Sequence, residues 1–326
     1  MAFAFAITNG FHDASNAIAT LVATRVARPV QAILLAAVCN LLGPLLLGAA
    51  VANTIATIVT VPASEEVTVV GAGLTGAVVW NLITWWRGIP SSSSHALVGG
   101  LVGAALATAG AAAVNWGGIE HGRPVGVFGS LIALAISPVL GFAAAALITR
   151  IARRALRRAS VRVEGVIRNA QWVTSGWLAF SHGANDAQKT VGIIAALLLA
   201  TGRTATLDAP RWVILSCSFA LTIGTAMGGW SIVRTIGSRI VRLRPLDGLV
   251  SQASSAGVIL ASSVIGAPVS TSQIVSSSVV GIGIGRRRAR HVNWRIVGNI
   301  GIAWLTTMPA AAAFAVLSLP VWRWLT

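Results

Sequence analysis

The chain has 326 residues, of which 55% are hydrophobic and only 10% charged, and its mean hydropathy is +0.80. This scarcity of charge excludes an ordinary soluble domain of the same length. Apolar runs of about 20 residues, the length that crosses a bilayer as a helix, recur along the chain. The two cysteines lie within apolar segments and indicate neither a disulfide framework nor a metal cluster. We therefore expect an all-α polytopic membrane protein.

The apolar runs predict about ten membrane segments. In chain order they are residues 1–24, 30–58, 68–86, 91–114, 125–149, 170–200, 212–233, 249–265, 268–285 and 294–318. Five segments precede the basic stretch 150–168 and five follow it, and an odd number in each half places the halves in opposite orientations. The sequence thus predicts two inverted-topology repeats, 1–149 and 169–326, joined by a basic cytoplasmic linker at 150–168. Only 12 residues precede Asp13, so we expect either a short first helix or a true N-terminus upstream.

The net charge of +16 is distributed unevenly between the loops. Most of the 24 Lys and Arg residues fall in alternate loops, including 150–168 and 286–293, whereas half of the eight acidic residues fall in the others. The positive-inside rule makes the arginine-rich side cytoplasmic in a multi-pass protein of the cell (inner or plasma) membrane. We expect these loops to contact anionic lipid rather than nucleic acid. A homo-oligomer is compatible with the sequence.

An acidic motif occurs once in each half. Residues 9–20 read NGFHDASNAIAT and residues 181–192 read SHGANDAQKTVG, and each places one Asp inside apolar sequence. Carboxylates at membrane depth are costly and mark substrate or ion pathways, although a lone one can also be a structural hydrogen-bonding centre. Asp13 and Asp186 therefore predict a single site assembled from two halves.

A proline followed by hydroxyl residues also occurs once in each half. Residues 89–95 read IPSSSSH and residues 267–273 read APVSTSQ, at 77 residues from Asp13 to Pro90 and 82 from Asp186 to Pro268. Proline breaks a helix, and the helix that restarts after it presents unpaired N–H groups to an anion. We predict broken or re-entrant helices after Pro90 and Pro268 whose hydroxyls converge on one anion, although such hydroxyls can also bond back to helical carbonyls. The predicted substrate-binding hydroxyls are those of Ser91, Ser92, Ser93, Ser94, Ser270, Thr271 and Ser272.

A phosphate-like anion between two carboxylates requires compensating positive charge. Lys189 lies three residues after Asp186 and supplies one charge, whereas Asn16 occupies the matching place after Asp13. The remaining charge must come from H⁺, Na⁺ or a divalent metal that travels with the anion. We predict Asp13, Asn16, Asn40 and Asp186 as candidates for cation coupling. His12, His95 and His182 can either orient their neighbours or carry a proton.

At these residues the sequence resembles the PiT family of inorganic phosphate transporters. Residues 10–17, GFHDASNA, and 183–190, GANDAQKT, are similar to the duplicated family signature G-x-N/H-D-x-x-N-A, and the two proline–hydroxyl motifs also look like the family's. The resemblance implies a symporter that carries phosphate with H⁺, Na⁺ or as a metal–phosphate complex, without a resident cofactor. Asp13, Asn16, Asp186 and both hydroxyl segments would then form the site.

One departure from the family pattern bears on the coupling ion. Gln188 and Lys189 replace the small residue and Asn of the sodium-coupled pattern, so a fixed ammonium would stand where a mobile cation binds. We therefore favour H⁺ or a metal–phosphate complex over Na⁺. The alternatives are a carrier of sulfate, another oxyanion or a divalent cation. A more distant one is an intramembrane hydrolase with a serine of 91–94 as nucleophile, His95 as base and Asp13 to orient it.

Overall fold

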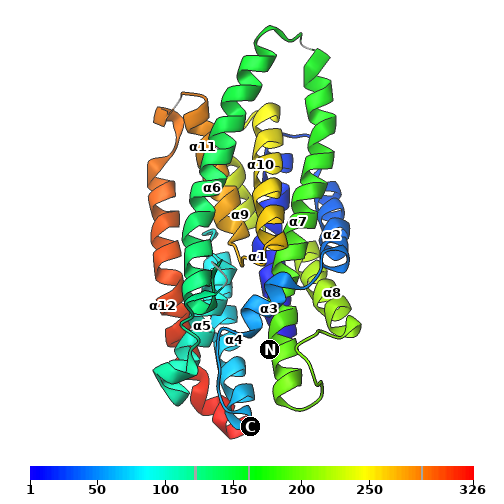
Figure 1. Cartoon of the computed structure of the whole chain (residues 1–326). Coiled ribbons are helices and arrows are strands. Elements are labelled where there is room, and N and C mark those ends of the chain that lie inside the picture. Colours follow the sequence, from blue (N-terminus) through cyan, green and yellow to red (C-terminus); the bar gives the residue numbers. More distant parts are fainter. Residues whose placement is uncertain (121–122, 161, 288) are drawn as a thin grey trace.

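The computed structural model describes residues 1–120, 123–160, 162–287 and 289–326. These residues form a helical bundle whose β-structure is one two-residue hairpin, Ile119–Glu120 (β1) with Arg123–Pro124 (β2), plus an isolated bridge. Three short 3₁₀ segments, η1 (Ala111–Ala113), η2 (Leu156–Arg158) and η4 (Ala289–His291), and a π-helical turn, η3 (Thr235–Arg239), join some of the described helices (Figure 1). The α-helices are α1 (Ala2–Ala23), α2 (Pro29–Leu46), α3 (Ala50–Ala56), α4 (Ala63–Trp86), α5 (Ser93–Ala109), α6 (Gly126–Ala155), α7 (Arg162–Ala200), α8 (Arg211–Met227), α9 (Trp230–Arg234), α10 (Pro245–Val264), α11 (Thr271–Gly285) and α12 (Trp294–Leu325).

Four of the described helices are long and apolar enough to cross a membrane. They are α2, α4, α6 with its 3₁₀ extension, and α12, and a fifth span results if α8 and the bent segment 230–239 are counted together. The all-helical class is as expected, but the number of ten segments stays a prediction. Length and hydropathy do not identify α1 and α7 as membrane spans, because the polar residues of the two Asp motifs lower the mean hydropathy of these helices.

The predicted segment 30–58 is not one helix. It divides into α2 and α3 at residues 47–49. At this break the Gln188 side chain of α7 forms hydrogen bonds with backbone groups that would otherwise bond within a continuous helix. Its amide donates to the Leu47 carbonyl at 3.1 Å and its oxygen accepts from the Val51 N–H at 2.9 Å. In the second half, α8 and the segment 230–239 meet at an angle of 61° after Gly228 and Gly229. The first half thus contains the interrupted pair α2 and α3, and the second half contains the bent pair of α8 with the segment 230–239.

Helix breaks occur after both predicted prolines. α5 and α11 begin with Ser92 and Ser270 as N-caps, whose hydroxyls accept the backbone N–H groups of His95 and Gln273 at 3.2 and 3.3 Å. Both starts lie near the middle of the bundle rather than at an end. In Figure 1 the α4–α5 pair occupies the lower half of the molecule and the α10–α11 pair the upper half. The two hydroxyl segments therefore approach one another from opposite ends.

The first two long helices of each half pack against those of the other half. α1 lies against α8 and α7 lies against α2, through backbone contacts that only glycine permits. A Cβ added at Gly10 would lie 2.2 Å from the Leu221 carbonyl oxygen, and one at Gly183 would lie 2.3 Å from that of Asn40. The reciprocal contacts repeat this arrangement, with Gly43 against Phe180 and Gly224 against Ile7. Two further pairs, α6 with α11 and α5 with α12, also pack a helix of one half against a helix of the other.

The predicted linker 150–168 is largely helical. α6 continues to Ala155, a 3₁₀ turn (η2, Leu156–Arg158) follows, and α7 begins at Arg162. Ala, Leu and Arg favour helix, so both helices extend past the bundle into the projection at the top of Figure 1. We call this end, with residues 24–28, 150–160, 162–168, 240–244, 286–287 and 289–293, the basic end. Residues 161 and 288, which belong to the loops predicted as cytoplasmic, lie outside the described residues, and the sidedness of these loops stays a prediction.

We predict that Gly224→Ala destabilises the protein. The added methyl group would lie 2.0 Å from the Ile7 carbonyl oxygen, so α1 and α8 must separate, at a cost of about 1–3 kcal/mol. Thermal unfolding in detergent measures this effect. Gly257→Ala in α10 is the matched control, because no atom lies within 4 Å of its added methyl group. Equal melting temperatures for the two variants would contradict the close α1–α8 contact.

Candidate functional site

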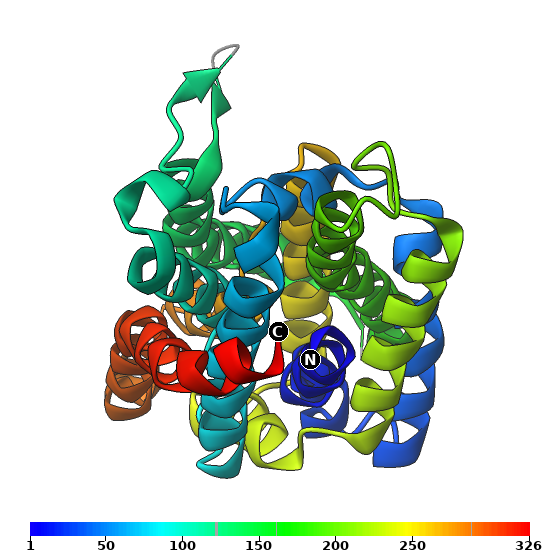
Figure 2. The same ribbon diagram turned by 90° about the horizontal axis from the view of Figure 1, so that it is seen from below.

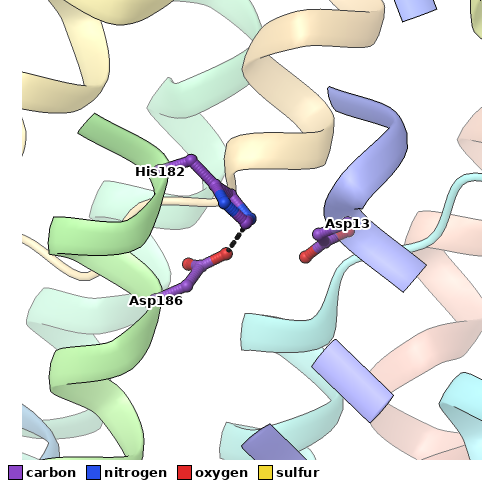
Figure 3. Close-up of side chains that lie close together, drawn as sticks. All are labelled: Asp13, His182 and Asp186. Carbon is purple, nitrogen blue, oxygen red and sulfur yellow. Dashed lines mark ion pairs between the residues drawn. The ribbon is translucent and has the colours of Figure 1, made fainter. Parts of the chain in front are cut away.

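Four structural pieces meet at the centre of the bundle: α1, α7 and the first turns of α5 and α11. Asp13 lies in the middle of α1 and Asp186 in the middle of α7, and both side chains are buried, with exposures of 1% and 0%. Figure 3 shows their carboxylates directed toward each other, with the His182 ring beside Asp186. The structure thus brings the two acidic motifs together at the centre of the bundle, and their function as one binding site stays a prediction.

Asp13 accepts hydrogen bonds from both hydroxyl segments. Ser93 Oγ donates to Oδ2 at 2.8 Å, and Ser272 Oγ donates to Oδ1. The His12 ring places Nδ1 at 3.0 Å from Oδ1. A carboxylate with several donors is stabilised in its charged form even where water is excluded. Asp13 therefore holds the starts of α5 and α11 together.

Asp186 has a related but different set of partners. Thr271 Oγ1 donates to Oδ2 at 3.1 Å, and His182 Nε2 lies 2.9 Å from the same oxygen. Lys189 forms an ion pair with Oδ1. The Thr271 bond repeats, in the second half, the bond that Ser93 makes to Asp13.

The Lys189 ammonium is fully buried, with an exposure of 0%. Its three N–H donors have three acceptors, which are Asp186 Oδ1, Ser94 Oγ at 2.6 Å and the Val269 carbonyl at 3.1 Å. At the matching position, Asn16 Nδ2 donates to Ser272 Oγ at 3.0 Å, and Asn16 Oδ1 has no hydrogen-bond partner among the described residues. The two halves thus differ at this position by one fixed positive charge.

Four other residues of the predicted site form hydrogen bonds with the neighbours of Asp13 and Asp186 or cap the helices that carry these neighbours. Ser92 and Ser270 cap their helices, and Ser91 Oγ contacts His12 and Thr84 at 3.2 and 2.9 Å. Asn40 donates to Thr225 at 2.9 Å, and its oxygen lies 3.0 Å from His182 Nδ1. These side chains position the groups that contact Asp13 and Asp186. Their role in binding stays a prediction.

Sequence reasoning missed two contributors to the site, Thr84 and the Val269 carbonyl, and the structural role of Gln188. Thr84 lies 3.2 Å from His12 Nε2 but belongs to an apolar stretch without a motif. The Val269 carbonyl is a backbone group, and only its place between Pro268 and Ser270 could have indicated it. Gln188 was noted as a departure from the family pattern, but the gap between α2 and α3 that it bridges has no signature in the sequence.

The buried charges of the site do not cancel. Two carboxylates and one ammonium leave one net negative charge when the histidines are neutral, and this charge opposes the entry of a further anion. Ligand atoms of Asp13, His182 and Asp186 lie within 4.8 Å of one another, as in groups that can hold a metal ion. Carboxylate and imidazole together suit a divalent metal better than they suit Na⁺.

Comparison with known proteins bears directly on this arrangement. The model of the "Phosphate transporter family" matches residues 9–315. The chain belongs to this family. A "Probable low-affinity inorganic phosphate transporter" of Rhizobium meliloti is 41% identical, over 97% of this chain and 93% of that protein. A protein of the same description from Bacillus subtilis is 39% identical, again over 97% and 93%.

The same fold is present in a solved structure described as "The sodium-dependent phosphate transporter". It aligns with a TM-score of 0.87 at 25% identity and covers 100% of this chain and 98% of that one. The family and its relatives are transporters and not enzymes, so the hydrolase alternative is wrong. His95 Nδ1 does contact the Ser92 hydroxyl at 2.7 Å, but the ring beside Asp13 is that of His12, so Asp13 does not orient His95 as that alternative requires. Family and apolar helices together indicate a protein of the cell membrane.

We predict that Asp186→Asn and Lys189→Met each destabilise the protein more than the double variant does. Either single change leaves one buried charge without its partner, at a cost of about 3–5 kcal/mol, whereas the double change removes both charges. Thermal unfolding of the three variants in detergent measures the coupling. A double variant at least as unstable as the worse single variant would show that the pair does not act as a unit.

Proposed function

We propose that the protein is a secondary active symporter that imports inorganic phosphate together with a cation. The observation that carries this proposal is the repeated set of contacts at the site. Ser93–Asp13 and Thr271–Asp186 form one matched pair of hydrogen bonds, and Asn16–Ser272 and Lys189–Ser94 form another. Such matched contacts are expected if residues 1–149 and 169–326 are inverted repeats that share one substrate site. The relatives described as inorganic phosphate transporters support phosphate as the substrate.

Phosphate recognition would use the hydroxyls and the helix N-termini of α5 and α11. These groups offer O–H donors and backbone N–H groups that point toward one place, which is a favourable environment for an oxyanion. Each hydroxyl has a single proton. When Ser93, Thr271 or Ser272 donates to a phosphate oxygen, the carboxylate that it served loses a donor. The carboxylate then needs a proton or a cation, so anion binding and cation binding are coupled by the same hydroxyls.

The carboxylates also favour phosphate over sulfate, the nearest rival substrate. Near neutral pH phosphate retains at least one O–H group, which can donate to Asp13 or Asp186, whereas sulfate has only acceptors. A buried carboxylate that faces an acceptor without a proton loses a hydrogen bond and gains repulsion. Binding of sulfate therefore costs free energy that binding of phosphate avoids.

We propose H⁺ or a divalent metal, rather than Na⁺, as the coupling ion. Lys189 holds a carboxylate, a hydroxyl and a carbonyl oxygen, which are the ligand types that a hard metal cation uses. The ammonium thus takes the place of one mobile cation. A proton on Asp13, or a metal at Asp13, His182 and Asp186, would supply the remaining charge. The solved relative is described as sodium-dependent, so the coupling ion requires a direct experiment.

The location of the protein follows from the same proposal. The basic end, which includes the predicted loops 150–168 and 286–293, would lie in the cytoplasm and contact anionic lipid. Phosphate would then enter from the opposite end of the bundle. Association into a homo-oligomer is compatible with this arrangement.

We predict that proteoliposomes containing the protein accumulate phosphate when an H⁺ or Mg²⁺ gradient is imposed, and that a Na⁺ gradient alone drives no uptake. Arsenate, which has the shape and protonation of phosphate, should compete, and sulfate should not.

Asp13→Asn should abolish uptake while the protein remains folded. Strict Na⁺ dependence at a fixed pH gradient would refute the proposed coupling, and indifference to arsenate would refute phosphate as substrate.

We predict that Lys189→Asn changes the cation dependence of uptake more than its KM for phosphate. The substitution makes the second motif match the first, where Asn16 stands, and removes the fixed charge, so uptake should become dependent on added Na⁺. Initial rates against Na⁺ concentration measure this change. Lys189→Arg, which retains the charge, serves as the control. An unchanged cation profile in Lys189→Asn would assign Lys189 a purely structural role.

A further inference from the structure

A cavity of about 720 Å³ lies between α3, the first half of α6 and the turn that joins α10 to α11. It begins near Pro124 at the end of the bundle opposite the basic end and continues to Val269 in the middle of the structure. Its polar lining comes from Asn53 and Thr54 of α3, from Thr57 directly after α3 and from Ser262 of α10. Figure 2 views the molecule from this end, with α3 and the start of α6 on the near side.

The inner wall of this cavity is in direct contact with the site. Val269 lines the cavity, and its carbonyl oxygen accepts hydrogen bonds from Lys189 Nζ and Ser94 Oγ, both at 3.1 Å. One peptide unit therefore separates the cavity from the groups around Asp186. Movement of the short segment 267–269 would join the two.

The other half of the chain contains residues that correspond to the turn and the short helix beside the cavity. Thr54 donates to the Gly266 carbonyl at 2.8 Å, and Thr235 donates to the Gly88 carbonyl at the same distance. Both glycines have positive φ, 75° and 65°, and each lies two residues before the proline of its hydroxyl segment. The turn 87–92 is thus the counterpart of 265–270, and the segment 230–239 is the counterpart of α3.

The cavity and the equivalent region of the other half differ in the size of one side chain, which is Ala133 in the first and Trp304 in the second. α6 and α12 each contain a proline near the middle, Pro138 and Pro309. Five residues before it stands Ala133 in α6, where it lines the cavity, and Trp304 in α12. The Trp304 indole N–H donates to the Pro90 carbonyl at 3.1 Å and so ties α12 to the first hydroxyl segment. The Ser231 hydroxyl adds a bond to the Trp85 carbonyl at 2.9 Å, where the counterpart in α3, Ala50, has no hydroxyl.

We propose that the cavity beside Ala133 is the water-filled route by which phosphate reaches the site, and that Trp304 closes the equivalent route toward the basic end. The proposal rests on the proposed phosphate transport and adds the path and the residue that blocks it. The open and closed sides are occupied by matched residues of the two halves. Transport toward the basic end then requires the Trp304–Pro90 contact to open while the segment 267–269 closes the cavity.

The first experiment measures access by thiol labelling in a Cys39→Ala, Cys217→Ala background. Ile132 lines the cavity, and Ala303, six residues before Pro309 as Ile132 is before Pro138, is buried beside Trp304. A charged, membrane-impermeant reagent applied from the side opposite the basic end should label Ile132→Cys, and phosphate should slow the labelling. Ala303→Cys should resist the reagent from either side and become reactive, from the basic end, when Trp304→Ala is added.

The second experiment places a tryptophan in the cavity, at the position of α6 that corresponds to Trp304 in α12. Ala133→Trp should fill the cavity, protect Ile132→Cys from the charged reagent and reduce phosphate uptake to background. Leu131→Trp, on the same helix but outside the cavity lining, is the control and should retain uptake.

Labelling of Ile132→Cys only by a lipid-soluble maleimide would show a lipid-filled groove and overturn the proposal. Normal labelling and uptake in Ala133→Trp would overturn it as well, and so would unreactive Ala303→Cys in the Trp304→Ala background. Labelling needs no transport. Failure of phosphate as the substrate, with labelling as expected, is therefore distinguishable from failure of the route.

Discussion

The arrangement of the bundle depends on two carboxylates that are buried at its centre. Asp13 and Asp186 cannot remain charged in a dry interior without donors, and the structure supplies these donors from two helix starts and one lysine. Because Ser93 and Ser272 both donate to Asp13, the first turns of α5 and α11 must meet at the same depth. The α4–α5 and α10–α11 hairpins reach this point from opposite ends of the bundle (Figure 1).

The glycine contacts have the same origin. Gly10 and Gly183 lie three residues before Asp13 and Asp186 and allow close approach to α8 and α2. Residues three apart lie on nearly the same face of a helix, so each of these glycines brings its helix close to a helix of the other half beside the carboxylate. The glycine of each acidic motif is therefore a packing residue, and the Asp that follows it is the polar group that this packing holds in place.

Much of the site could be predicted from the sequence, because the relevant groups recur in a matched order. The pairing of Asp13 with Asp186 and the helix breaks after Pro90 and Pro268 follow from local chemistry that is repeated in both halves. The division of α2 from α3, the helical continuation through 150–158 and the Val269 carbonyl at Lys189 could not be predicted in this way. They depend on side chains and backbone groups that are distant in sequence and have no motif of their own.

In the proposed mechanism, two departures from the matched pattern would set which access state the empty protein favours. Symmetric halves would make the two access states nearly equal in free energy, so a small asymmetry decides which state dominates. The Trp304 hydrogen bond contributes about 0.5–1.5 kcal/mol, and the apolar burial of its ring adds about 1–2 kcal/mol. Together these shift a two-state population by about ten- to several hundredfold, which is small enough for binding of phosphate and its cation to reverse. In the same proposal Lys189 would set the net charge of the site at which phosphate and its cation bind, and both Lys189 and Trp304 belong to the second half of the chain.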